Sequence, residues 1–160
     1  MENFEIIDIK RIKHNSYYSG LLQNLYAGSE SSISLLLQLL YDANILSCFS
    51  RDIAKTFFEF SQDEIHNQYI LSQCILMVGG DPLFLNSQNK WFSGRNVDYV
   101  KDIRQIIILL IENIEKIILD LKLTISKIDD FQLKKHLTTV LRNEKEHLEK
   151  INEMKNTYIK

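Results

Sequence analysis

Glu144-Lys145-Glu146-His147 places an acid and a base on a helix face that is otherwise apolar. Read as a helix, the last segment repeats its inward residues in alternating steps of four and three, so these side chains share one face. The members of this stripe are Leu133, Leu137, Val140, Glu144, His147, Ile151, Met154 and Tyr158. A carboxylate in a core is costly unless it is paired or bound to a metal, so this polar pair is the main functional clue.

A second polar pair interrupts the stripe of an earlier helix. That stripe consists of Phe57, Phe60, Glu64, Asn67, Leu71, Cys74 and Val78. Glu64 and Asn67 are three positions apart, as are Glu144 and His147, so each pair lies side by side on its helix. Bundles that hold two metal ions take one Glu from each of two helices and a Glu-x-x-His from each of the other two. The two pairs are therefore candidates for one shared site.

Turn signals divide the chain into a short leading helix and four long ones. The predicted helices cover 16–26, about 29–48, 51–78 and 98–128, and the segment from the turn at 129–130 to about 158. Gly79-Gly80-Asp81-Pro82 ends the second long helix, because Gly adopts the left-handed cap and Pro cannot continue a helix. Residues 83–97 form a connection long enough to cross from one end of a bundle to the other. We therefore predict an all-α four-helix bundle over 16–160, preceded by an arm over 1–15.

Composition limits the possible classes of function. The chain has 160 residues, 45% hydrophobic and 25% charged, as expected for one soluble globular domain. A formal net charge of -2, with Lys and Arg scattered among acids, gives no reason to expect nucleic acid. The longest apolar run, 106–111, is too short for a bilayer, and the start lacks the pattern of a signal peptide, so we predict a cytoplasmic protein. Cys48 and Cys74 lie in apolar helical stretches and are predicted to be buried free thiols.

The chain resembles the ferritin-like superfamily, and within it the bacterial branch allied to rubrerythrin and the spore-coat manganese catalases. The similarity covers roughly residues 20–154, and its motifs occur in order along the chain. They are LQNLYAG at 22–28, LQLLY at 37–41, GGDPLF at 79–84, WFSG at 91–94, IDD at 128–130 and NEKEHL at 143–148. The resemblance implies an up-down-down-up ferritin-like bundle. It also implies a bacterial protein, for which a spore-coat or stress role would follow from the family alone.

The resemblance further implies a set of metal ligands, of which this sequence retains about half. Glu144 and His147 match the family on the last helix, and Glu64 matches on the second long helix. In the family these three positions, with a Glu from the third long helix, serve one of the two metals. Two carboxylates and one imidazole could hold a single Fe, Mn or Zn ion with open positions.

The other family ligands are replaced. Asn67 stands where the family has His, whereas Ser32 and Ile114 stand where it has Glu on the first and third long helices. Three nearby side chains are one or two positions out of register, namely Glu30, His66 and Glu115. One position of slip turns a side chain by about 100°, away from the shared face. We therefore do not count them as ligands unless a helical bulge shifts the register.

Two functions remain open. The first is a non-catalytic structural or interaction protein with a degenerate di-metal centre, in which two buried carboxylates share a proton. The second is a metalloprotein of the oxidoreductase class that holds one ion through Glu64, Glu144 and His147, or two if out-of-register ligands join. The middle of the third long helix is apolar nearly all round, which predicts a homodimer, and a further protein partner is possible.

Overall fold

The computed structural model describes residue 10 and residues 12–159. In this part of the chain the elements are α1 (Ser16–Ala27), α2 (Ser32–Leu46), α3 (Arg51–Met77), η1 (Gly94–Asn96, a 3-10 helix), α4 (Ile103–Lys127) and α5 (Phe131–Tyr158). The predicted short leading helix and four long helices are confirmed. Most of the predicted arm, 1–9 and 11, lies outside the described residues. Residues Ile12 and Asn15 are tied to the end of α3 by backbone hydrogen bonds to Met77 and Val78.

The largest difference in helix bounds is at α4, which begins at Ile103 rather than near residue 98. Asp102 is its N-cap, and one Asp102 oxygen accepts hydrogen bonds from the backbone N–H groups of Arg104 and Gln105, each at 3.1 Å. The cap residue has an extended backbone, so the preceding residues belong to the crossover.

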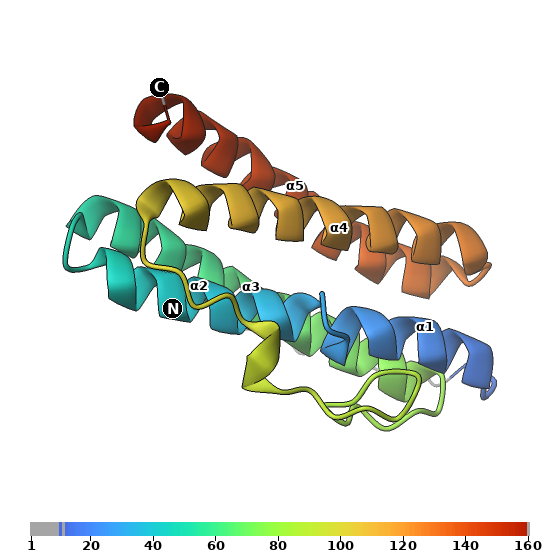
Figure 1. Cartoon of the computed structure of the whole chain (residues 1–160). Helices are drawn as coiled ribbons and strands as arrows, with labels where there is room; N and C mark the ends of the chain where they lie inside the picture. The colour runs from blue at the N-terminus through green and yellow to red at the C-terminus, as the bar shows by residue number, and fades with distance from the viewer. Residues whose placement is uncertain (1–9, 11, 160) are drawn as a thin grey trace.

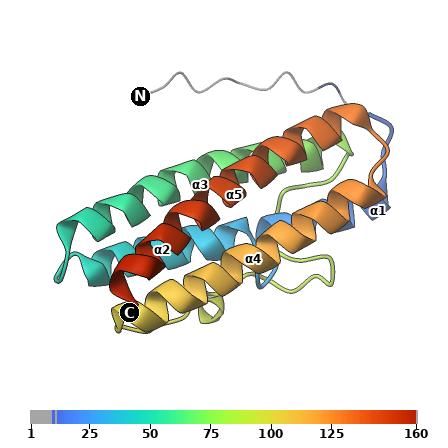
Figure 2. The same cartoon turned by 90° about the horizontal axis from the view of Figure 1, so that it is seen from above.

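The four long helices form two hairpins joined by a crossover. α2 packs along α3, and α4 packs along α5. Figures 1 and 2 show that α3 and α4 run in the same direction, opposite to α2 and α5, which is the predicted up-down-down-up order. The crossover after α3 passes beside α1 and then returns along the bundle to the start of α4 (Figure 1).

The turn after α3 depends on two glycines. Gly79 has a φ of 77°, in the left-handed region that residues with a Cβ rarely adopt. A Cβ at Gly80 would collide with the Ser19 hydroxyl oxygen and lie 2.8 Å from a methyl group of Ile75. The chain therefore passes close to α1 at a point where only glycine fits.

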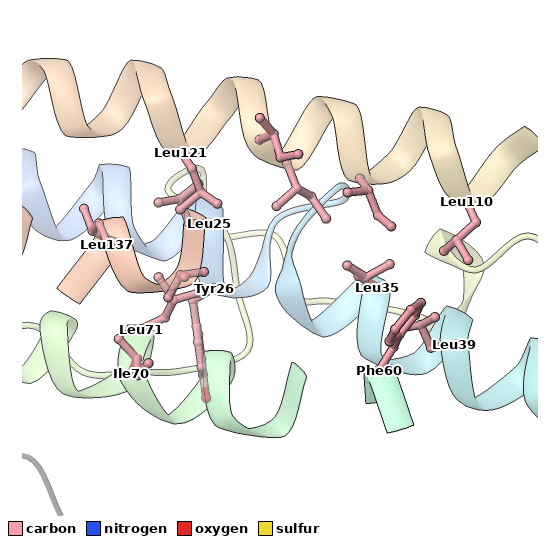
Figure 3. Close-up of a cluster of buried hydrophobic side chains, with 14 of the residues drawn as sticks. Leu25, Tyr26, Leu35, Leu39, Phe60, Ile70, Leu71, Leu110, Leu121 and Leu137 are labelled. Carbon is pink, nitrogen blue, oxygen red and sulfur yellow. The ribbon is translucent and has the colours of Figure 1, made fainter. Parts of the chain in front are cut away.

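Apolar side chains from all five helices fill the interior. Figure 3 shows Leu110 and Leu121 of α4 directed toward the helices below, where Leu25 of α1 and Leu35 of α2 lie. This agrees with the predicted stripes over most of their length. The stripe of α5 leaves the core near its end, where Tyr158 is exposed.

One thiol differs from the prediction. Cys74 is buried as expected, but Cys48 is exposed. The reason is that α2 ends at Leu46, so Cys48 lies in the turn before α3 rather than on a packed helix face.

Candidate metal centre

α3 and α5 bring the two polar pairs of the sequence together in the core. Glu64, Asn67 and Glu144 are completely buried, and His147 is almost so. One potential ligand atom from each of Glu64, Glu144 and His147 lies within 4.8 Å of the others. In the described part of the chain, this is the one group of three such side chains close enough to share a metal ion. We call these three residues the candidate metal centre.

His147 faces the centre with one ring nitrogen and the surface with the other. Its Nε2 lies 3.0 Å from Oδ2 of Asp63, whose side chain is 57% exposed. Because a carboxylate can only accept a hydrogen bond, Nε2 carries a proton, and in the neutral imidazole Nδ1 then carries a lone pair. This Nδ1 lies 3.7 Å from Oε2 of Glu144 and 3.8 Å from Oε1 of Glu64.

Neutral donors hold the two glutamates. The Ser32 hydroxyl donates to Oε2 of Glu64 at 2.7 Å. Nδ2 of Asn67 donates to Oε1 of Glu64 at 2.8 Å and to Oε1 of Glu144 at 3.1 Å. Asn67 is itself held by Asn143, whose Nδ2 donates to Oδ1 of Asn67 at 2.8 Å. Three of the four carboxylate oxygens are thus hydrogen-bonded.

Two polar atoms of the centre have no hydrogen-bond partner although they are buried. They are Oε2 of Glu144 and Nδ1 of His147, which face each other at 3.7 Å. Both carry lone pairs when the carboxylate is ionised, so they repel unless a proton or a cation lies between them. The residues present therefore fit a bound cation, and two oxygens with one imidazole nitrogen suit a divalent transition metal.

The pKa values of Glu64 and Glu144 also show that two negative charges are unfavourable here without a cation or a proton. Burial raises the pKa of Glu64 well above its ordinary value, and the charge of Glu144 raises it further, although Ser32 and His147 oppose this. Burial likewise raises the pKa of Glu144 to about 7, against hydrogen bonds to Glu64 and Asn67 that lower it. Without a cation, the two carboxyl groups therefore share at least one proton near neutral pH.

Neither Ser32 nor Ile114 supplies a carboxylate to the centre. Ser32 reaches Glu64 with a hydroxyl, whereas Ile114 is fully buried and has no donor or acceptor. The three out-of-register residues lie outside the candidate metal centre. Glu30 and Glu115 are exposed, and Glu30 instead accepts a hydrogen bond from Lys116 at 2.6 Å. His66 is half-buried. α2 to α5 are continuous α-helices, so no bulge shifts the register.

Sequence reasoning missed two residues that support the centre. Asp63 lies one position outside the inward stripe and its side chain is 57% exposed, yet it contacts His147. Asn143 received no role, yet it anchors Asn67. Each immediately precedes one of the two glutamates, and that position is the signal that could have found them.

Comparisons with known proteins bear on the fold. No family model and no curated protein matches this sequence. Among solved structures, the chain is similar to wild-type KatB, a manganese catalase from Anabaena, with a TM-score of 0.88 and 15% identity over 98% of this chain and 79% of that one. A second structure, KatB from Anabaena PCC7120, gives a TM-score of 0.87 and 15% identity over 95% and 76%. At this identity the likeness concerns the fold alone, and it confirms the predicted ferritin-like bundle.

Proposed function

We propose that this ferritin-like protein binds a single divalent transition-metal ion, Mn, Fe or Zn, between α3 and α5. The observation that supports the proposal most is the facing pair of buried, partnerless atoms, Oε2 of Glu144 and Nδ1 of His147. Oε1 of Glu64 lies 3.8 Å from the same nitrogen and completes a set of three ligands. A cation here would replace the shared proton and give both atoms a partner. Manganese is the first ion to test, since the structurally similar KatB is a manganese catalase.

The surrounding residues have separate tasks in such a centre. Asp63 fixes the ring of His147 and keeps the proton on Nε2, which leaves Nδ1 available. Ser32 and Asn67 orient Glu64. A bound ion with open positions would act as a Lewis acid or redox centre toward water or peroxide, the chemistry of an oxidoreductase.

A second candidate function is a metal-free structural or interaction protein. It is favoured by the hydrogen bonds from Ser32 and Asn67, which satisfy three of the four carboxylate oxygens without any cation. One shared proton would then complete the cluster. In that case the centre would be degenerate and non-catalytic, and a spore-coat role would rest on the family resemblance alone.

Metal analysis of protein purified without chelator separates the two candidates. We expect about one equivalent of Mn, Fe or Zn per chain, and we expect His147→Ala to lose it, since a ligand nitrogen is removed. His136→Ala is the matched control, because His136 lies on the same helix but outside the centre. Elemental analysis by mass spectrometry provides the measurement.

Two other results would contradict the proposal. Two equivalents per chain would show that our ligand assignment is wrong and that residues outside the centre take part. No metal, with His147→Leu as stable as the wild type or more so, would favour the structural protein, since an apolar residue often replaces a buried polar group without loss.

Location and assembly remain predictions. None of the described helices has the length and hydropathy needed to cross a membrane. We propose a cytoplasmic protein that forms a homodimer and does not bind nucleic acid.

A further inference from the structure

The centre contains the same side-chain arrangement twice, with different chemistry. On each of α3 and α5, the residue just before the buried glutamate contacts the residue three positions after the glutamate of the other helix. One contact joins Asp63 to His147 at 3.0 Å, an acid and a base. The other joins Asn143 to Asn67 at 2.8 Å, two neutral amides. One side of the centre thus carries an acid–base pair, and the other side carries a pair of neutral amides.

The orientation of Asn67 is fixed by its partners. Its Oδ1 accepts from Asn143, so its Nδ2 must face the glutamates. The two hydrogens of Nδ2 go to Oε1 of Glu64 and Oε1 of Glu144. An amide nitrogen has no lone pair to offer a metal, and the amide oxygen that could bind one is turned away. This side of the centre therefore offers donors of hydrogen bonds where an ion would need donors of electron pairs.

We propose that Asn67 is a positioning residue that takes the place of a second cation. Its two N–H groups hold Glu64 and Glu144 together, as a bridging ion would, and leave one ion site on the side of His147. The inference rests on the proposed single-ion function and specifies how that function is maintained. Ser32 supports it, because its hydroxyl donates to Oε2 of Glu64 and supplies no carboxylate for a second ion.

The first test measures the binding of Mn²⁺ to the full chain by electron paramagnetic resonance. We expect the wild type to bind about one ion with the spectrum of an isolated Mn²⁺. Asn67→Leu keeps the side-chain size but removes both N–H donors, so affinity should fall roughly tenfold or more. Asn152→Leu is the matched control, since Asn152 on α5 donates only to the backbone carbonyl of Leu148.

Asn143→Ala is a second variant with less risk to folding, because Asn143 is only half-buried. This variant keeps Asn67 but removes the hydrogen bond to its Oδ1. We therefore expect a smaller loss of Mn²⁺ affinity than in Asn67→Leu. Melting temperature and circular dichroism confirm that each variant is folded.

The converse test rebuilds the missing side. The triple variant Ser32→Glu, Asn67→His, Asn143→Asp should take up a second equivalent and show the spectrum of two coupled Mn²⁺ ions. Binding to Asn67→Leu that is as tight as to the wild type would overturn the inference and leave the proposed single-ion function intact. Two ions in the wild type would overturn both the inference and the single-ion assignment, although the protein would still bind metal. Failure of the wild type to bind Mn²⁺, Fe²⁺ or Zn²⁺ would overturn the proposed function and this inference together.

Discussion

Asp42 is a fully buried carboxyl group on α2 that lies outside the candidate metal centre. One of its oxygens accepts a hydrogen bond from Nε2 of Gln38 at 3.0 Å, and the other has no partner. Burial raises the pKa of Asp42 to about 7, the charge of Asp98 adds to this, and the hydrogen bond from Gln38 opposes it. An acid of this kind makes stability depend on pH.

Asp42→Asn should remove that dependence. Below the ordinary pKa of 3.8, Asp42 is protonated in both the folded and the unfolded chain, so its stabilising contribution is complete. As the pH rises toward 7, the unfolded chain releases the proton first, and the free energy of unfolding falls by roughly 2–4 kcal/mol. The free energy of unfolding of Asp42→Asn should therefore rise relative to that of the wild type as the pH increases over this range.

Denaturant unfolding at several pH values between 4 and 8 provides the measurement for Asp42. The pKa of Glu144 is raised too, so the free energy of unfolding of Asp42→Asn should still fall somewhat with pH. The difference in this slope between the variant and the wild type measures the contribution of Asp42. Asp81→Asn, at an exposed position in the crossover, should follow the wild-type curve. If the curve of Asp42→Asn also runs parallel to that of the wild type, the prediction is wrong.

Single residues of the centre differed in how well the sequence predicted them. The three-position spacing placed Glu64, Glu144 and His147 inward, because helical periodicity fixes which residues share a face. Asp63 is one position away from Glu64, so periodicity assigned it to the surface. It is indeed half in solvent, but packing of α5 against α3 brings His147 within hydrogen-bonding distance of it. Periodicity within one helix holds no information about such contacts between helices.

At the scale of elements, the crossover shows what sequence length alone could predict. The length of 83–97 predicted that the chain crosses the bundle, but not what holds it there. The structure shows that Nε2 of Gln23, on the buried side of α1, donates to the backbone carbonyls of Leu83 and Leu85. Phe84 between them stacks on Tyr26 with ring centroids 5.4 Å apart. These anchors lie some sixty residues away in the sequence, where no local pattern indicates them.

Gln23→Ala should therefore loosen the crossover. It leaves two carbonyl groups without their partner and a gap beside α1, so we expect a loss of about 1–3 kcal/mol in the free energy of unfolding. Amide hydrogen exchange should accelerate in residues 83–92, where backbone pairing includes Phe92 to Phe84. Gln88→Ala, in the exposed part of the same crossover, is the control and should change neither quantity. Unchanged exchange in Gln23→Ala would show that the aromatic stack alone holds the segment.

At the scale of the whole molecule, the fold was predictable because its determinants are local and repeated. Long apolar stripes and helix caps specify the helices, the Asp129-Asp130 turn joins α4 to α5, and the long connection after Gly79-Gly80-Asp81-Pro82 orders the two hairpins. α4 carries apolar residues on its outer side as well as on the side that faces the core. Within one chain, nothing in the described structure covers them.

The outer side of α4 predicts a dimer interface. Ile108, Leu119 and Leu123 are exposed, the last two by 55% and 47%, and their spacing places them on one face. Apolar residues aligned in this way on a helix surface are typical of subunit contacts. We expect the wild type to be a dimer by light scattering, and the double variant Leu119→Glu, Leu123→Glu to be a folded monomer, because charges at the contact would have to be desolvated. The matched control is Phe58→Glu, Ile65→Glu on α3, whose side chains are about equally exposed at 51% and 53%. A control variant that dissociates while the α4 variant stays dimeric would place the interface on α3, and a monomeric wild type would contradict the prediction of a dimer altogether.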